Sequence, residues 1–259
     1  MELERNWQTY RTLVNDKVAI FSVNLAIFQQ YASEAGSLKK VVQFTIPYTA
    51  DDEGLPQAEE HQILFRNIMQ ALSTLNALSE TLYAGHIVSE SKAKLYFYTN
   101  NTEAFCSVVK DLGYANQIDI QDDPNWDIYF DFLLPSPLES KINATEEILD
   151  LLVQHGRNLE DTFLVEHTFY FEHKDNLFEF LESASLDNIS FNTLQYTDEP
   201  IQVNEEEWLY MVKMEQELAL NTKEIYMLVE KFEQLANTYF GEYAGWECEA
   251  LIQTKNQLN

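Results

Sequence analysis

The sequence predicts an α+β protein built from two tandem sandwiches, each with a mainly antiparallel sheet that carries helices on one face. Three observations predict this class: the chain has 259 residues, which exceeds a typical single domain, strand-like and helix-like patterns alternate along it, and their order recurs in the second half. Its apolar share of 46% and aromatic share of 13% are enough for two packed cores. We therefore expect an N-terminal domain at residues 1–135 and a C-terminal domain at 140–259.

The first half combines strands that show period-two alternation with two helices that show an apolar stripe. Asn101 is an N-cap candidate for the second helix, and Gly113 stands where a C-terminal glycine belongs. In the last strand, Trp126 and every second residue as far as Leu134 would point inward. The expected elements are strands at 17–28, 41–48, 86–90, 93–99, 117–121 and 126–134, and helices at 56–82 and 101–113.

A boundary between the domains is expected at the proline-rich stretch 135–137, because proline lacks the amide donor that a central strand needs. Beyond it, Asn143 and Glu146 have the spacing of a capping box for a linker helix, and Asn221 and Glu224 repeat that spacing before the last helix. The following order of strand, helix, strand, strand, helix, strand predicts a ferredoxin-like (βαββαβ) domain. Its elements are expected at 162–173, 175–184, 188–196, 207–217, 221–240 and 242–252.

Charge is the most unusual global property of the chain, which has 16 Lys and Arg against 43 Asp and Glu and a formal net charge of -27. Residues 136–259 carry 25 of the acids and 7 of the bases. Such a surface repels phosphate backbones and anionic lipids, so direct binding of nucleic acid or membrane is not expected. The charge suits either solubility alone or a protein partner with a basic segment.

The N-terminal sequence, the length of the apolar runs and the cysteine content all favour a cytoplasmic location. The chain does not open with a basic segment followed by an apolar one, and no apolar run approaches the roughly 20 residues of a membrane-spanning helix. Cys106 and Cys248 lie in different halves without a CxxC motif, which suits a reducing compartment.

No pattern in the chain predicts catalytic residues, a cofactor or a metal. His167 and His173 share one face of a strand but lie about 20 Å apart along it, too far for one metal ion, and Glu166 falls on the other face. Cys106 sits near a helix start but beside an apolar stripe, which is typical of an inert thiol. No phosphate-binding or nucleophile-elbow glycine motif occurs.

The tail segment Gly241-Glu-Tyr-Ala-Gly-Trp-Glu-Cys-Glu-Ala250 concentrates glycine, tryptophan and cysteine, yet a strand explains it without chemistry. Strict alternation would send one set of its side chains to the core and the other set outward. The inward set would be Ala244, Trp246, Cys248 and Ala250, and the outward set Tyr243, Glu247 and Glu249.

Three segments resemble known families. The run from Phe240 to Glu247 is similar to the C-terminal signature of the regulator of ribonuclease E activity B family, and the stretch 165–181 is similar to its first strand and helix. Residues 1–135, with Asn6-Trp7 near the start and Asn125-Trp126-Asp127-Ile128-Tyr129 near the end, resemble a bacterial domain of unknown function that is often fused to it. The resemblance implies a small acidic protein that acts by binding, as the named family member does when it docks on the noncatalytic scaffold of ribonuclease E. Ala244 stands where that family usually has aspartate.

We therefore expect a noncatalytic regulator that binds a basic protein segment, with ribonuclease E as the partner that the resemblance implies. The expected partner-binding residues are Glu205, Glu206, Glu207, Glu242, Tyr243, Glu247 and Glu249, with Tyr243 as an amphipathic anchor. Three alternatives stay open: the acids only solvate a sheet edge, the chain is a hydrolase or other small-molecule enzyme with a site between its domains, or the acids mimic a nucleic acid.

Overall fold

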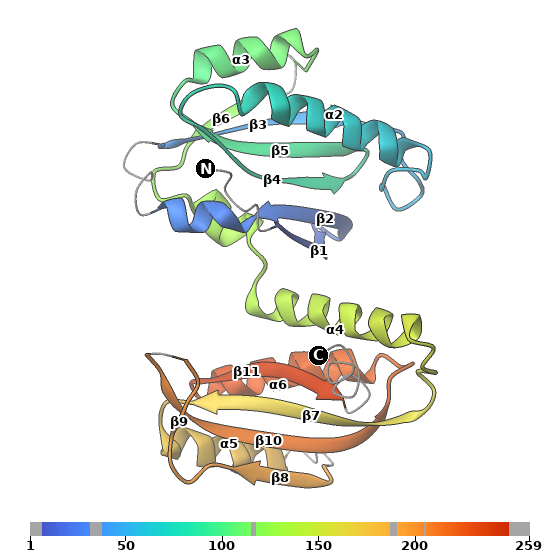
Figure 1. The fold of residues 1–259 in the computed structure, drawn as a ribbon, viewed down its shortest axis with the longest axis vertical. Helices are drawn as coiled ribbons and strands as arrows, with labels where there is room; N and C mark the ends of the chain where they lie inside the picture. Colours follow the sequence, from blue (N-terminus) through green and yellow to red (C-terminus); the bar gives the residue numbers. More distant parts are fainter. Residues whose placement is uncertain (1–6, 32–37, 115–117, 187–190, 205, 249–259) are drawn as a thin grey trace. The chain divides into compact units, whose positions relative to one another are not determined.

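The protein consists of two α+β units, each with one antiparallel sheet and its own helices (Figure 1). The computed structural model describes residues 7–31, 38–114, 118–186, 191–204 and 206–248, and the chain divides into two compact units, 1–139 and 140–259. The predicted α+β class with two separate sheets is confirmed. None of the helices among the described residues has the length and apolar character that crossing a bilayer requires.

The sheet of the first unit has six strands. They are β1 (Trp7–Val14), β2 (Lys17–Asn24), β3 (Lys40–Pro47), β4 (Thr81–Ser89), β5 (Lys92–Thr99) and β6 (Asp119–Asp122). Their order across the sheet is β1-β2-β4-β5-β3-β6, and every neighbouring pair is antiparallel. Asn15 and Asp16 join β1 to β2, and Glu90 and Ser91 join β4 to β5; all four have positive φ, as two-residue hairpin turns of type I′ require.

Both faces of this sheet are covered, whereas we expected helices on one face only. Helices α2 (Glu60–Leu75) and α3 (Thr102–Asp111) pack on one face, where Leu64 and Phe105 join the core. The opposite face packs against the 3₁₀-helix η1 (Leu25–Gln30) and the π-helix η3 (Ile128–Leu133) (Figure 1). Strand β3 is therefore buried on both sides from Val41 to Ile46.

The expected strand at 126–134 is wrong, because this segment forms helical turns. Asp123 is buried, and its carboxylate accepts hydrogen bonds from the amide nitrogens of Asp127 at 2.8 Å and Ile128 at 3.0 Å, which caps the turn. The Tyr98 hydroxyl donates a third bond to the same carboxylate at 2.6 Å. The buried residues of η3 accordingly follow a spacing of four rather than the alternation of a strand.

Sequence patterns did not predict β1 or η1. Strand β1 lies at the sheet edge, and only Tyr10 in it is fully buried, so its apolar residues do not alternate clearly. The expected strand at 17–28 ends at Asn24, whose side chain accepts a hydrogen bond from the amide of Ala26 at 3.1 Å and starts η1. Asn101 caps α3 as expected.

The second unit has a sheet of four main strands in the order β11-β7-β10-β8, and the short β9 pairs with β10. Its elements are β7 (Thr162–Phe171), α5 (Lys174–Leu186), β8 (Thr193–Tyr196), β9 (Ile201–Gln202), β10 (Trp208–Ala219), α6 (Glu224–Thr238) and β11 (Gly241–Cys248). Apart from β9, their order along the chain is the predicted strand, helix, strand, strand, helix, strand. The expected extension of the last strand to residue 252 lies outside the described residues.

One face of this second sheet is covered by α5 and α6. Phe169 of β7 contacts Phe180 of α5 and Phe232 of α6, with ring centroids 4.7 and 5.2 Å apart. Helix α4 (Pro137–Gln154) reaches the same side through Thr145, whose hydroxyl accepts a hydrogen bond from the indole nitrogen of Trp246 at 3.0 Å. In the part of the unit that the structure describes, no helix covers the opposite face (Figure 1).

The capping box of α4 uses residues other than the expected ones. The amide of Glu139 donates to the Ser136 hydroxyl at 3.2 Å, and the amide of Ser136 donates to the Glu139 carboxylate at 2.9 Å. Pro137 takes the first helical position, where a missing amide costs nothing. The capping boxes expected at 143–146 and 221–224 are both wrong, because the first range lies inside α4 and, at the start of α6, the amide of Glu224 donates to the Thr222 hydroxyl at 3.3 Å instead of to Asn221.

Candidate functional site

His86, which is half-buried, and His167, which is buried, both have side-chain partners within their own sheets. No three or more His, Cys, Asp or Glu in the described ranges are placed to hold a metal ion. In the first unit, His86 Nδ1 lies 2.7 Å from the Tyr83 hydroxyl, and burial lowers the pKa of His86 to about 4. Both groups therefore belong to the packing of the first sheet.

His167 stands at the centre of a buried polar network in the second unit. Its Nδ1 lies 2.8 Å from the Tyr243 hydroxyl, its Nε2 lies 3.0 Å from the side-chain amide of Gln216, and its ring packs on Phe232. Burial lowers the pKa of His167 to about 3, so the ring is neutral at physiological pH. Burial, together with the nearby Glu233 carboxylate, raises the pKa of Tyr243. This network holds β7, β10 and β11 together.

Tyr243 is therefore not the exposed anchor that strict alternation predicts, because its side chain is 0% exposed. The register of β11 shifts between Tyr243 and Gly245, so that Ala244 forms a bulge and is exposed. Tyr243 and Trp246 are three residues apart and would face opposite sides of a regular strand. The extra residue lets both enter the core.

The opposite face of the second sheet carries a cluster of like charges, which we call the outer sheet face. Alternation places Glu166 of β7, Glu215 of β10 and Glu247 of β11 on it, and Glu166 is directly opposite both of the others. These three form a glutamate row that spans about 10 Å, because neighbouring strands lie about 4.8 Å apart. The charged residues that the described strands place on this face are Glu166, Lys213, Glu215, Glu217, Glu242 and Glu247.

The charges of the glutamate row are only partly compensated. Lys213 forms an ion pair with Glu166, and the Thr193 hydroxyl donates a hydrogen bond to Glu215. Glu247 has no ion pair among the described residues, and its side chain is exposed. Like charges placed directly opposite each other destabilise a sheet by about 0.2–1 kcal/mol per pair. The row therefore lowers the stability of the unit unless a cation covers it.

The predicted partner-binding residues do not gather in one place. Glu242 and Glu247 lie on the outer sheet face, at separate positions along β11. Glu206 and Glu207 are exposed in the turn before β10, where the Asn204 side chain accepts a hydrogen bond from each of their amides at 3.0 Å. The remaining two, Glu205 and Glu249, fall outside the described residues.

Sequence reasoning missed Glu215 and Glu217 and did not connect Glu166 with Glu247. Alternation alone places Glu166 away from His167, but it does not show which residue of another strand lies opposite. That information is contained in the register between β7, β10 and β11, and no local pattern in the sequence reports it.

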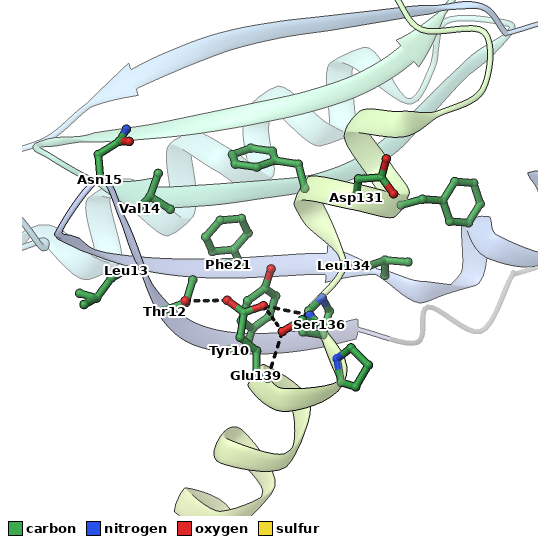
Figure 2. Close-up of a pocket in the computed structure, with 14 residues that line it drawn as sticks. Tyr10, Thr12, Leu13, Val14, Asn15, Phe21, Asp131, Leu134, Ser136 and Glu139 are labelled. Carbon is green, nitrogen blue, oxygen red and sulfur yellow. Dashed lines mark hydrogen bonds between the residues drawn. The ribbon is translucent and has the colours of Figure 1, made fainter. Parts of the chain in front are cut away.

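A pocket of about 590 Å³ lies in the first unit, between β1, the end of η3 and the start of α4 (Figure 2). Its apolar walls include Phe21, Phe130, Phe132 and Leu134. The Tyr10 hydroxyl donates to the backbone oxygen of Leu133 at 3.0 Å, so Tyr10 offers the pocket its ring rather than a free polar group. This volume is within the range of about 300–1,000 Å³ that is usual for small-molecule sites.

The polar end of the pocket is built around Glu139. Its carboxylate accepts hydrogen bonds from the Thr12 hydroxyl at 2.6 Å and from the amide and hydroxyl of Ser136, each at 2.9 Å (Figure 2). Burial acts to raise the pKa of Glu139, but these hydrogen bonds outweigh it and leave the pKa below its ordinary value. The carboxylate is therefore an anion at neutral pH.

Fold and sites together define a two-unit α+β protein that presents an acidic sheet face on one unit and a separate pocket on the other. Residues 5–134 match the model of the Family of unknown function (DUF695), and residues 142–248 match the model of Regulator of ribonuclease activity B. The first match covers half of the chain, which therefore belongs to the DUF695 family. The second match shows that residues 142–248 are similar to a family of regulators of ribonuclease activity. Both resemblances seen in the sequence motifs are confirmed.

Other comparisons add little. No curated protein matches the chain. Among solved structures, the crystal structure of an unknown protein from Galdieria sulphuraria is 10% identical, with 82% of this chain and 97% of that chain covered and a TM-score of 0.23. A similarity this low carries no argument about fold or function.

Proposed function

We propose that the second unit is a noncatalytic regulator of ribonuclease activity that binds a basic segment of its protein partner on the outer sheet face. Ribonuclease E is the partner that we expect. The observation that carries this proposal is the glutamate row, because it places three carboxylates side by side on a sheet face that no described helix covers. The match of residues 142–248 to Regulator of ribonuclease activity B supports the regulatory role.

The geometry of the row suits an extended basic chain. A segment that crosses β11, β7 and β10 would pass Glu247, Glu166 and Glu215 within about 10 Å. Same-side residues of an extended chain are about 6.6–6.8 Å apart, so two or three Lys or Arg side chains could each reach a carboxylate. Tyr170 and Met211 lie opposite each other on the same face and offer apolar contact beside Glu242.

Charge pairing of this kind determines association rate and specificity more than the final affinity. Because Glu247 is exposed and Glu166 and Glu215 are half-exposed, salt should weaken the complex. The row would then lower the stability of the free protein slightly and, in return, provide the surface that recognises a positively charged partner.

The remaining expectations belong to the same proposal. We propose that residues 1–135 and 140–259 are separate domains, that the second is a ferredoxin-like sandwich, and that the protein works in the bacterial cytoplasm. The βαββαβ order with both α5 and α6 on one sheet face supports the ferredoxin-like assignment.

The test is binding of a basic scaffold fragment of ribonuclease E to the full chain, measured by isothermal titration calorimetry at low and moderate salt. The variant E166Q/E215Q/E247Q neutralises the row. The control E179Q/E182Q/E230Q removes the same number of charges from exposed positions on α5 and α6, on the other side of the sheet.

We expect the row variant to weaken binding by about tenfold or more and the control to change it by less than about twofold. Equal losses in the two variants would show that only net charge matters. Absence of binding at low salt would exclude ribonuclease E as the partner.

A further inference from the structure

We propose that the pocket of the first unit binds a small organic cation, an amine or guanidinium on an apolar stem, with the Glu139 carboxylate as its counter-charge. This inference concerns the first unit alone and does not depend on the proposed function of the second unit. Three features of the pocket support it: a fixed anion, aromatic walls and the sign of the lining charge. A fourth point is that the charge of Glu139 can be removed without removing its role in the cap of α4.

The first feature is an anion that is held in place without a cation. All three donors to Glu139 are neutral groups of Thr12 and Ser136, and no Lys, Arg or His of the described residues lies within ion-pair distance of it. Three bonds fix both carboxylate oxygens in one orientation (Figure 2). A positioned carboxylate that lacks a counter-charge suits a ligand that brings one.

The second feature is the aromatic wall next to this anion. Phe21 stacks on Tyr10 with ring centroids 4.9 Å apart and meets the edge of Phe132 at 5.7 Å. Phe130 and Leu134 continue the apolar lining. Such rings bind an aliphatic or aromatic stem through apolar contact, and their faces attract an ammonium or guanidinium group through cation–π interaction.

The third feature is the sign of the lining charge. The residues that line the pocket include the two carboxylates Asp131 and Glu139 and no Lys, Arg or His. A smaller hollow of about 170 Å³ adjoins the first pocket at Val14 and Phe132, and its charged lining residues, Glu90, Lys92 and Lys94, have a net positive charge. An anionic ligand would therefore prefer the smaller hollow, and the larger pocket selects for positive charge.

The fourth point is that Glu139 has a structural role in the cap of α4, which can be tested separately from ligand binding. Glu139 also completes the capping box of α4, so an acid at this position could serve the helix alone. A capping box accepts Gln as well as Glu at this position. The substitution Glu139→Gln therefore keeps the cap and removes the charge.

The test is titration of the full chain with 2-phenylethylamine at about 150 mM salt, which screens the general acidity of the protein. Binding is followed by calorimetry and by amide chemical shifts. The neutral isostere 2-phenylethanol and the anion 3-phenylpropanoate serve as matched probes. Glu103→Gln is the control variant, because Glu103 is exposed in the first turn of α3 and lies outside the pocket lining.

We expect saturable binding of the amine with a Kd of roughly 1 mM or tighter, given the small size of the probe. E139Q should weaken it by about tenfold and E103Q by less than about twofold. The alcohol should bind about tenfold more weakly than the amine, and amide shifts should fall on β1 and the 130–139 segment.

A second variant keeps the proposal open to refutation if E139Q is poorly folded. Asp131 lines the pocket and is exposed, so Asp131→Lys should leave the fold intact and replace an acid of the lining with a competing cation. D131K should also weaken binding of the amine by about tenfold. Equal binding of alcohol and amine, tighter binding of the anion, equal losses in E139Q and E103Q, or no saturation at about 10 mM would each overturn the proposal.

Discussion

Lowering the pH should destabilise the second unit through His167. The ring is 0% exposed and lies between the Tyr243 hydroxyl and the Gln216 amide, and no carboxylate is hydrogen-bonded to it. Burial lowers the pKa of His167 to about 3, whereas the unfolded chain has the ordinary value of about 6.5. Below pH 6.5 the unfolded state therefore binds a proton that the folded state does not bind, and the stability gained from the neutral ring is lost as the pH falls toward 3.

The magnitude follows from the two pKa values. Between pH 7.5 and pH 5, the linkage relation gives a loss of about 2 kcal/mol of unfolding free energy from His167 alone. This figure changes little if the folded pKa is 4 instead of 3, because both values lie at least one unit below pH 5. Further loss continues down to the folded pKa and then stops.

The assay is native-state hydrogen exchange of β7 amides in the full chain at the two pH values, corrected for intrinsic exchange rates. The substitution His167→Gln keeps a polar side chain at this position and removes the titrating ring. We expect the fall in protection between pH 7.5 and pH 5 to be about 2 kcal/mol smaller in the variant. An equal fall in both proteins, or an imidazole that titrates near pH 6.5 by NMR in the folded state, would refute the reasoning.

Three further predictions concern single residues. Glu247→Gln should stabilise the second unit by about 0.2–1 kcal/mol at low salt, because it removes the repulsion from Glu166, and the gain should shrink in 1 M salt, as chemical denaturation would show. Asp123→Ala should destabilise the first unit by about 3 kcal/mol, because it removes a buried cap; a loss below about 1 kcal/mol would contradict this role. Gly85→Ala should cost about 1–3 kcal/mol in thermal unfolding, because a Cβ there would lie 2.6 Å from the Ser22 oxygen.

The fold class and most elements of the second unit could be predicted, because the alternation of a strand and the apolar stripe of a helix are visible within the residues of each element. The long helix α6 shows this well, since Ile225, Val229 and Phe232 are buried where the helical spacing expects them. Segment 126–134 was predicted as a strand because every second residue from Trp126 to Leu134 is apolar. The competing signal was the buried cap at Asp123, and that role depends on Tyr98 from another strand.

The candidate sites were harder to predict from the sequence. Tyr243 could not be placed correctly, because a bulge at Ala244 reverses the alternation and no residue pattern announces it. The glutamate row depends on strand register, which brings Glu166 between two residues that are distant in the sequence. The pocket of the first unit depends on β1 and on the start of α4 at Pro137, and neither was expected.

The most direct test of the central claim is an amide chemical-shift map of the full chain during addition of a basic ribonuclease E fragment. If the outer sheet face binds the partner, the largest shifts will fall on Glu166, Glu215, Glu247 and their strand neighbours, and they will fade as salt is raised. Shifts confined to α5 and α6, or spread evenly over both units, would contradict the account.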